Sequence, residues 1–257
     1  MSDIAVSLQN IDFAYDKKQI YKDFFIDINT NDIFFIMGIN GCGKTTLLKI
    51  ICSFLPVSRG KIIIDGKDIK QLDSKSFSRI VSYVPQTINL SSDYLVKDYL
   101  AMGRTPYKKF YSSIDASDYQ VVEKHAREFD IENLLGINFN SLSGGQKQIV
   151  TICRAIIQET PIIIMDEPMS ALDLGKQAEF LSLLLRLKEQ GKTIILTSHN
   201  PNHALAIKEY CKTCLLIDGS ILACGNSTEV LTKDNFECVF GNKIHLDINS
   251  NSIIFNI

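Results

Sequence analysis

The sequence lacks long apolar runs. Although 46% of its 257 residues are hydrophobic, no stretch approaches the roughly 18–20 consecutive apolar residues that a membrane-spanning helix needs. The N-terminus, Met-Ser-Asp-Ile-Ala-Val, also lacks the basic and apolar regions of a secretory signal peptide. We therefore expect a soluble chain that stays inside the cell, and any role at a membrane must come through a partner.

The sequence also lacks a strong excess of charge, internal repeats and low-complexity linkers. Its net charge is −2 and its pI is about 6.1, so bulk electrostatics give no reason to expect nucleic acid as a partner. A chain of 257 residues fits one large domain, or a domain with a small appendage.

The seven cysteines do not form a recognisable metal or disulfide framework. Cys211 and Cys214 make a C-x-x-C motif, which often indicates zinc or redox chemistry, but no second pair or histidine partner lies near it in the sequence. Because Cys214 opens the apolar run 214–217, buried packing is the favoured interpretation. An odd number of free thiols fits a reducing cytoplasm.

A glycine-rich segment, by contrast, is well defined. Residues 38–46 read Gly-Ile-Asn-Gly-Cys-Gly-Lys-Thr-Thr and contain the G-x-x-x-x-G-K-[ST] pattern. The apolar run 33–37 before them suits a buried strand, and 44–54 has apolar residues at helical spacing. The alternative is a glycine-rich turn that contains Lys-Thr by chance. The strand-turn-helix setting argues against it, because this arrangement directs backbone N–H groups and a helix dipole at one anion.

This loop is predicted to hold the phosphates of a nucleotide. Glycines permit positive φ angles and close approach of the backbone. Lys44 adds positive charge near the terminal phosphates, and the Thr45 hydroxyl is suited to bind Mg²⁺. The predicted nucleotide-binding residues of the loop are Gly38, Asn40, Gly41, Cys42, Gly43, Lys44, Thr45 and Thr46.

Two adjacent acids form a second candidate site. Asp166 and Glu167 follow the apolar run 162–165, at the expected carboxyl end of a strand, where ligands of open α/β sheets bind. Adjacent side chains on an extended chain point to opposite sides, so the two acids should have different roles. Asp166 is suited to hold Mg²⁺, and Glu167 to polarise the water that attacks the γ-phosphate.

A third signal lies at Leu142-Ser-Gly-Gly-Gln146. Ser143 and Gln146 have the spacing of a capping box, which predicts a helix start. Two glycines in the first turn are unfavourable to a helix by about 1 kcal/mol each. Close approach of the backbone to an anion would compensate, so a second anion site is predicted at Ser143, Gly144 and Gly145.

The order of the remaining segments predicts an α/β fold. Apolar runs at 162–165, 193–197 and 214–217 alternate with helical patterns, which favours a mainly parallel sheet. Strands are also expected over 4–11, 24–28, 62–64 and 80–84, with turns at 17–19 and at Asp65-Gly66; helices are expected over 94–102 and 115–129. The tail 243–257 has partial period-2 alternation and is expected to form a hairpin.

With these motifs, the chain resembles the ATP-binding subunits of ABC transporters over roughly residues 3–230. The resemblance implies a RecA-like P-loop NTPase core with an N-terminal antiparallel β-subdomain. It places a helical subdomain at about 87–158 within an ATP-binding domain at 1–240, leaving 241–257 as an extension. It also implies ATP and Mg²⁺ as ligands.

In that family two copies form a head-to-tail dimer, in which the Ser-Gly-Gly segment of one copy caps ATP held by the loop of the other. The resemblance therefore adds Ser143, Gly144, Gly145, Gln146 and Asp173 to the ATP-binding residues. It also implies two transmembrane permease subunits, a peripheral location on the cytoplasmic face of the membrane and, for an importer, an extracytoplasmic substrate-binding protein.

Three further residues match family positions. Tyr15 lies where an aromatic ring stacks on adenine, although a lone tyrosine is more often part of the core or surface. Gln86 matches a glutamine that senses Mg²⁺ and the attacking water, and His199 matches a histidine at the γ-phosphate. The resemblance thus makes Glu167, His199 and Gln86 catalytic and Thr45, Gln86 and Asp166 the metal-binding set.

Three positions depart from the commonest family form: Ile39, Cys42 and Met169. None removes a phosphate donor, a metal ligand or the carboxylate. A thiol beside Lys44 and a helix N-terminus should favour the thiolate, so we expect Cys42 to be open to alkylation that ATP prevents. A small residue tolerated in a tight loop is the alternative.

The segment 99–107, Tyr-Leu-Ala-Met-Gly-Arg-Thr-Pro-Tyr, is similar to importers of iron-siderophore, haem and cobalamin. From the residues alone it is a helix that ends at Gly103 before a turn. Zinc or manganese importers and exporters remain alternatives. A DNA-repair or chromosome-organising ATPase is disfavoured because the segment from Gln86 to Ser143 is too short for a coiled coil or DNA-binding region. A translation factor would need two phosphate loops.

Overall fold

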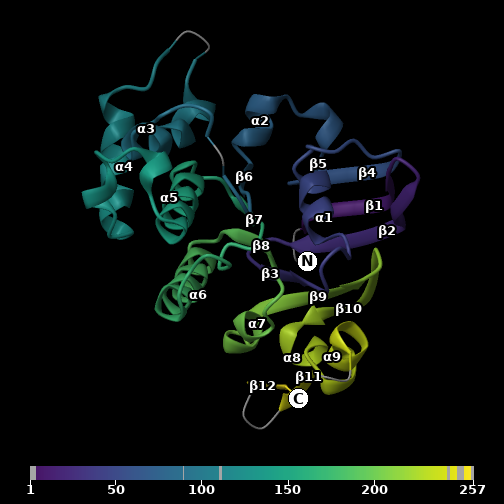
Figure 1. Ribbon diagram of the computed structural model, residues 1–257. Helices are drawn as coiled ribbons and strands as arrows, with labels where there is room; N and C mark the ends of the chain where they lie inside the picture. Colours follow the sequence, from purple (N-terminus) through teal and green to yellow (C-terminus); the bar gives the residue numbers. More distant parts are fainter. Residues whose placement is uncertain (1–3, 89, 110–111, 242–243, 248–251, 256–257) are drawn as a thin grey trace.

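The computed structural model describes residues 4–88, 90–109, 112–241, 244–247 and 252–255. They form a six-stranded sheet, a four-stranded sheet and a short two-stranded sheet, with helices around them (Figure 1). The predicted α/β class is confirmed. None of the helices in these ranges is long and apolar enough to cross a membrane.

The six-stranded sheet has the order β10-β9-β3-β8-β7-β6, and the strands from β9 to β6 are parallel, which confirms the predicted mainly parallel sheet. Every residue of β3, β7 and β8 is buried, as expected for short apolar runs covered on both faces. The strands are β3 (Ile33–Met37), β6 (Val81–Val84), β7 (Ile162–Met165), β8 (Thr193–Ser198), β9 (Cys211–Ile217) and β10 (Ser220–Asn226).

The four-stranded sheet is antiparallel, in the order β2-β1-β4-β5. Leu8 and Ile11 of its inner face share one apolar cluster with Phe34 of β3 and Leu47 of the helix after the glycine-rich loop. The two sheets therefore enclose that helix, α1 (Lys44–Ile51). The strands are β1 (Ile4–Tyr15), β2 (Lys18–Asn29), β4 (Arg59–Ile64) and β5 (Lys67–Asp68), so the predicted turn at 17–19 begins one residue earlier, at Asp16.

A separate group of helices lies beside the sheets in Figure 1 and has its own apolar cluster, which includes Val96, Val122, Phe139 and Val150. Asp115 and Ser143 begin two of these helices through capping boxes, as predicted for Ser143. The expected helix at 94–102 is shorter at both ends, because α3 begins at Val96 and Met102 already belongs to a 3₁₀ helix. The elements are α3 (Val96–Ala101), η2 (Met102–Tyr107), α4 (Ala116–Glu128), η3 (Glu132–Leu134), η4 (Phe139–Ser141) and α5 (Gly144–Ile157).

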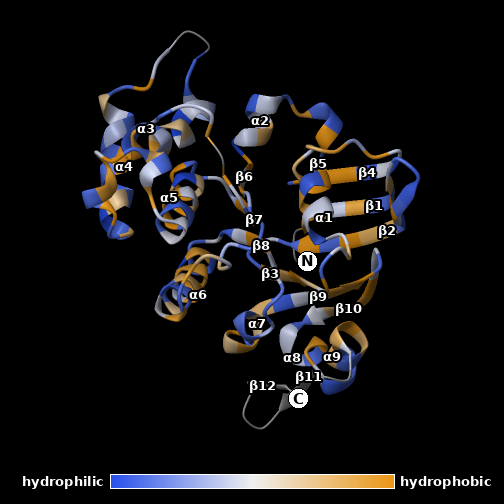
Figure 2. Cartoon of the chain, in the orientation of Figure 1, coloured by the Kyte–Doolittle hydropathy of each residue, from blue (hydrophilic) through white to orange (hydrophobic). Residues whose placement is uncertain are grey.

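The remaining helices cover the sheets or join strands. Apolar residues concentrate on the strands of both large sheets, while the outer helices alternate polar and apolar residues (Figure 2). These elements are η1 (Ile69–Gln71), α2 (Ser74–Ser78), α6 (Leu174–Glu189), α7 (Asn202–Ala206), α8 (Ser227–Val230) and α9 (Lys233–Phe240).

The C-terminal segment ends in the predicted hairpin. Strands β11 (Ile244–Asp247) and β12 (Ser252–Phe255) pair in antiparallel fashion, and Ile244 lies opposite Phe255. Residues 242–243, 248–251 and 256–257 of the predicted extension lie outside the described residues.

Two hairpins have the same Asp-Gly turn in different surroundings. Asp65-Gly66 joins β4 to β5 and Asp218-Gly219 joins β9 to β10, and all four residues have positive φ, as a type I′ turn requires. A Cβ on Gly219 would lie 1.8 Å from the backbone oxygen of Ile20, whereas one on Gly66 would meet nothing within 4 Å. Gly219 is thus where the β9–β10 hairpin packs against the antiparallel sheet.

We predict that Gly219→Ala lowers the free energy of unfolding much more than Gly66→Ala. Both substitutions place a Cβ at positive φ, which costs about 1–2 kcal/mol. Only Gly219→Ala also forces the hairpin away from β2, which should add roughly 2 kcal/mol. Urea unfolding of the two variants measures the difference, and equal losses would show that the close approach at Gly219 contributes nothing.

Candidate functional site

The glycine-rich loop connects β3 to α1, as predicted. Gly41 and Gly43 have φ angles of 82° and 111°, which glycine adopts without strain. Gly43 is the N-cap of α1 and no side chain caps this helix end, so its first N–H groups are open to an anion. The Lys44 Nζ donates hydrogen bonds to the carbonyl oxygens of Gly38 (2.8 Å) and Ile39 (3.0 Å), which hold the ammonium over the loop.

Asp166 joins the loop helix to the sheet. Its buried carboxylate follows β7, and one oxygen accepts hydrogen bonds from the hydroxyls of Thr45 (3.2 Å) and Thr197 (2.6 Å). Thr45 comes from α1 and Thr197 from β8, so three elements meet at one carboxylate oxygen. Thr45 and Asp166, two of the three residues predicted to hold Mg²⁺, are therefore in direct contact although they lie far apart in the sequence, whereas the third, Gln86, contacts Glu167.

Glu167 has different polar partners from Asp166. Gln86 Nε2 donates to Glu167 Oε2 at 2.9 Å, and His199 Nδ1 lies 3.2 Å from the same oxygen. Glu167 has a φ of 47°, an unfavourable conformation for a residue with a Cβ. Its N–H donates to Thr197 Oγ1 at 2.8 Å, which holds the strained backbone in place. The three predicted catalytic side chains thus form one cluster.

Gln86, Glu167 and His199 line one open cleft of about 490 Å³ together with residues of the glycine-rich loop, whereas Asp166 is buried behind Thr45 and does not line it. Tyr15, whose side chain is 43% exposed, lies at its edge with its hydroxyl 3.5 Å from Thr46 Oγ1. The cleft therefore has an aromatic ring at its edge and an acid, an amide and an imidazole among the residues that line it. The lining residues are Tyr15, Ile20, Asn40, Gly41, Gly43, Lys44, Thr45, Thr46, Gln86, Glu167 and His199.

Two predicted loop residues do not line the cleft: Gly38 and Cys42. Gly38 instead supplies a carbonyl to Lys44. The Cys42 side chain is 2% exposed and packs in the apolar cluster beneath the loop. Burial raises the pKa of the Cys42 thiol, and this effect outweighs the opposite effect of the Lys44 charge. The expectation of a favoured thiolate at Cys42 was therefore wrong, because the thiol faces the core.

Two residues that support the site were not identified from the sequence. Thr197 contacts both acids, and Tyr21 donates its hydroxyl to the Gly43 carbonyl oxygen at 2.9 Å. Burial raises the pKa of Tyr21, so the phenol stays protonated as a donor. A Cβ on Gly43 would lie 2.5 Å from the Tyr21 hydroxyl oxygen, so the glycine is required there. Only the position of Thr197 at the end of a strand hinted at its role.

The Ser-Gly-Gly segment lies outside this cleft. Ser143 Oγ and Gln146 form the capping box of α5, and Asp173 caps α6 by accepting from Lys176 N at 2.9 Å. A Cβ on Gly145 would lie 3.2 Å from the Ala171 oxygen, so this helix start packs against the turn before α6. Among the described residues that line the cleft, none comes from 143–146 or is Asp173.

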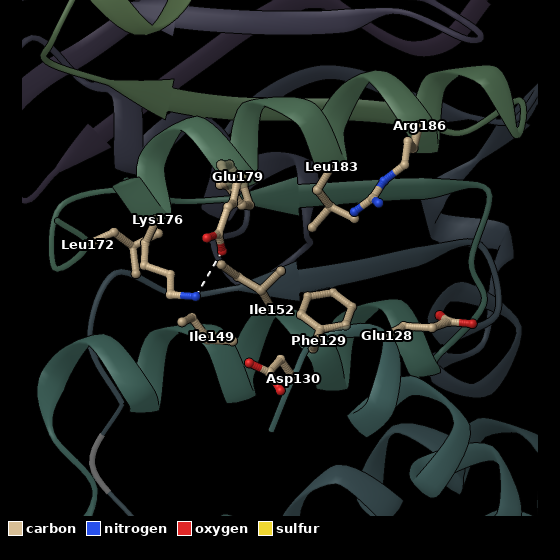
Figure 3. Close-up of a pocket in the computed structure, with 11 residues that line it drawn as sticks. Glu128, Phe129, Asp130, Ile149, Ile152, Leu172, Lys176, Glu179, Leu183 and Arg186 are labelled. Atoms are coloured by element: carbon tan, nitrogen blue, oxygen red, sulfur yellow. Dashed lines mark hydrogen bonds and ion pairs between the residues drawn. The ribbon is translucent and has the colours of Figure 1, made fainter. Parts of the chain in front are cut away.

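A different pocket, of about 250 Å³, lies between α6 and the helices α4 and α5 (Figure 3). Phe129, Ile149 and Ile152 form its apolar part, and the Lys176–Glu179 ion pair (2.9 Å) crosses its rim. It contains no residue of the glycine-rich loop and neither of the two acids, so we do not assign the nucleotide to it.

Thr45, which lines the cleft, and Asp166, which contacts Thr45, form a pair of oxygen ligands that fits Mg²⁺. In the described part of the chain no three His, Cys, Asp or Glu side chains gather as a metal cluster. Magnesium in phosphate sites does not need such a cluster, because one or two protein oxygens, water and the phosphates complete its coordination. The Thr45 hydroxyl and the Asp166 carboxylate are hard oxygen ligands of this kind, and they are already in contact.

Comparison with known proteins agrees with this geometry. A family model described as ABC transporter matches residues 21–170. The chain is 32% identical to the iron(3+)-hydroxamate import ATP-binding protein of Bacillus subtilis over 92% of its length and 87% of that protein. It is 34% identical to the molybdate import ATP-binding protein of Haemophilus influenzae, over 92% of its length and 88% of that protein.

A solved structure gives the same result at the level of the fold. The chain superposes on a chain of a putative metal-chelate type ABC transporter in an inward-facing conformation with a TM-score of 0.80. The two are 33% identical, and the match covers 93% of this chain and 89% of the other.

We predict that Thr197→Val destabilises the protein by about 2 kcal/mol, because it removes one of the two hydroxyl donors to the buried Asp166 carboxylate and the acceptor of the Glu167 N–H. Thr197→Ser keeps the hydroxyl and should recover most of the loss. Urea unfolding measures both. If the serine variant is as unstable as the valine variant, the methyl group rather than the hydroxyl is what matters at this position.

Proposed function

The chain belongs to the ABC transporter family and hydrolyses ATP, and we propose that it drives a membrane importer through closure of a head-to-tail dimer. The observation that carries this proposal is the position of the Ser-Gly-Gly segment outside the cleft of its own chain. A site with a complete phosphate loop and water-activating cluster still lacks a cap, and a second copy can supply one.

We propose that ATP lies along the cleft with its adenine on Tyr15 and its phosphates on the loop. The open N–H groups of α1 and the Lys44 ammonium would bind the β- and γ-phosphates. Thr45 and Asp166, with Gln86 at the same end, would hold Mg²⁺, which neutralises phosphate charge when bound. Lys44 would then exchange its two carbonyl partners for phosphate oxygens.

The cluster on Glu167 suits it to polarise water. Its carboxylate is mostly shielded from solvent, with a side-chain exposure of 14%, and among the described residues Gln86 and His199 are its polar partners at Oε2. Gln86 and His199 fix the carboxylate on the side of the cleft where the γ-phosphate would end. A water between Glu167 and that phosphate would give its proton to the carboxylate as it attacks.

In the dimer that we propose, Ser143, Gly144 and Gly145 of one copy approach the γ-phosphate held by the other. The N-terminal N–H groups of α5 are suited to this anion, because glycines leave them uncovered. Asp173 begins α6 just beyond Ala171, whose oxygen lies against Gly145. A shift of the Ser-Gly-Gly segment would therefore displace Ala171 and, with it, the start of α6.

A groove beside Gln86 is the proposed docking surface for the permease. It has a volume of about 510 Å³ and is lined by apolar side chains such as Leu72, Phe77 and Tyr83, with Phe54 58% exposed at its rim. Pro85 lines the groove, and the next residue contacts Glu167. An apolar cytoplasmic segment of a permease seated there would be one residue away from the catalytic cluster.

We propose a metal chelate of the iron-siderophore, haem or cobalamin class as the cargo. The names of the Bacillus subtilis relative and of the metal-chelate type structure support this class. The Haemophilus influenzae relative, a molybdate importer, adds an oxyanion to the alternatives. Import of zinc or manganese is a further alternative, and so is a role in an exporter. An importer of this kind would place the chain on the cytoplasmic face of the membrane, under two permease subunits, and would use an extracytoplasmic binding protein.

We predict that Glu167→Gln lowers ATP turnover by about 100-fold or more, because it removes the base, while ATP binding is retained. The bound ATP should then hold two copies together. Turnover and light scattering with ATP and Mg²⁺ measure the two effects, and Glu189→Gln, an exposed glutamate of α6, is the matched control. Rapid turnover by Glu167→Gln would remove this residue from its role.

Lys44→Ala should act at an earlier step. Loss of a charged donor to phosphate is worth roughly 1.5–3 kcal/mol, so ATP affinity should fall by about 10- to 100-fold. Titration with a fluorescent ATP analogue measures it. Unchanged affinity would show that the ammonium stays on the Gly38 and Ile39 carbonyl oxygens when nucleotide binds.

We predict that Phe54→Asp weakens co-purification with the permease and leaves ATP affinity unchanged, because a charge on the groove opposes apolar docking. Tyr210→Asp, at a side chain that is 57% exposed elsewhere, is the matched control. Equal permease recovery with both variants would place the docking surface away from this groove.

A further inference from the structure

The C-x-x-C motif does not work as a pair. Cys211 and Cys214 both lie on β9, where residues three apart point to opposite faces of the sheet. Cys211 belongs to the apolar cluster on one side, and its sulfur lies 3.1 Å from Ser227 Oγ. Cys214 belongs to the cluster on the other side, together with Cys42. The two thiols of the motif are therefore separated by the sheet.

The neighbour of Cys214 is instead Cys224. The two residues lie directly opposite each other in the antiparallel pair β9–β10. Directly opposed residues have Cα atoms about 4.5–5.5 Å apart, which is within the range of about 4.4–6.8 Å that a disulfide spans. Directly opposed residues of an antiparallel pair place their side chains on the same face of the sheet, so the two thiols project to the same side.

We propose that Cys214 and Cys224 are an oxidisable dithiol, in which Cys224 meets a peroxide and Cys214 resolves the product as an intramolecular disulfide. The two thiols differ in the way that such a pair requires. Cys224 is exposed on β10, the edge strand of the sheet, whereas Cys214 is fully buried. An oxidant in solution reaches Cys224 first.

The electrostatics of the pair favour the same order. The Cys214 thiol donates a hydrogen bond to the Cys224 sulfur and lowers the pKa of Cys224, with a further contribution from the Lys212 charge. The same bond, together with burial, raises the pKa of Cys214. The thiolate, which is the form that reacts with peroxide, is therefore concentrated on the exposed partner.

The chemistry balances with hydrogen peroxide as the oxidant. The Cys224 thiolate attacks one peroxide oxygen, breaks the O–O bond and becomes a sulfenic acid, and the other oxygen leaves as hydroxide, which takes up the proton that the Cys224 thiol released and becomes water. The Cys214 sulfur then attacks the Cys224 sulfur, and the sulfenic oxygen leaves as a second water with the Cys214 proton. Two thiols and one peroxide thus give one disulfide and two waters, and a dithiol reductant reverses the reaction.

The pair is close to the phosphate loop. The Gly219 N–H, in the turn of the same hairpin, donates to the Cys42 carbonyl oxygen at 3.3 Å. The Cys214 side chain packs in the same cluster as Cys42, under the loop. A disulfide at this place would therefore fasten the hairpin that supports the nucleotide site, and its formation does not depend on the proposed transport function.

The test is peptide mapping of the full-length protein after peroxide treatment. Reduced protein is treated with hydrogen peroxide while folded, free thiols are then blocked with N-ethylmaleimide, and digests are analysed by mass spectrometry. We expect a peptide that links Cys214 to Cys224 in the wild type, and its loss on treatment with dithiothreitol. Cys238→Ser, which removes another exposed thiol on α9, should keep the linkage, and Cys224→Ser should lose it.

Cys214→Ser adds a second readout. Without the resolving thiol, the sulfenic acid on Cys224 should persist and react with dimedone. Because Cys214 is buried, the folded state of this variant is checked by circular dichroism, and the Cys224→Ser result stands without it. The proposal is overturned if wild-type Cys224 is oxidised without linkage to Cys214, or if Cys238 reacts while Cys224 stays reduced.

Discussion

The hydrogen bonds that converge on the buried Asp166 carboxylate hold the site together. Burying a carboxylate is unfavourable unless donors satisfy it, and here the hydroxyls of Thr45 and Thr197 do so. One comes from the helix after the phosphate loop and the other from the neighbouring strand, so the acid fixes the distance between the loop and the sheet edge. Thr197 also accepts the Glu167 N–H, and so holds the strained residue that carries the second acid.

This arrangement fits the proposal that the cleft forms within a single chain and is completed by a second copy. Everything that depends on Asp166 comes from the central sheet and α1, and that part is rigid because its strands are buried on both faces. The Ser-Gly-Gly segment belongs to the group of helices with a separate apolar cluster, and it is connected to the sheet edge by the contact of Gly145 with Ala171. In the dimer that we propose, this segment would cap the ATP held by another copy and leave it again during the transport cycle.

Much of the fold and site could be predicted from the sequence because the signals were local. The strand-loop-helix around Lys44, the buried strand before Asp166 and the capping box at Ser143 each depend on a few adjacent residues, and each was found where expected.

Supporting contacts between distant segments could not be predicted in this way. Tyr21 and Thr197 look like ordinary strand residues until the sheets place them against the loop and the acids. The prediction of a thiolate at Cys42 was wrong for the same reason, because it rested on sequence neighbours whereas the side chain faces the core. The Cys214–Cys224 pairing likewise depends on the register of two strands, not on the spacing of a motif.

The central claim is that the phosphate loop of one copy is catalytic only with the Ser-Gly-Gly segment of another. The most direct measurement is ATP turnover per chain as a function of protein concentration, with the monomer–dimer equilibrium followed by light scattering under the same conditions. The account predicts that turnover per chain rises with the fraction of dimer and vanishes in dilute monomer, while ATP binding to the monomer persists. Turnover per chain that stays constant across the monomer–dimer transition would contradict it.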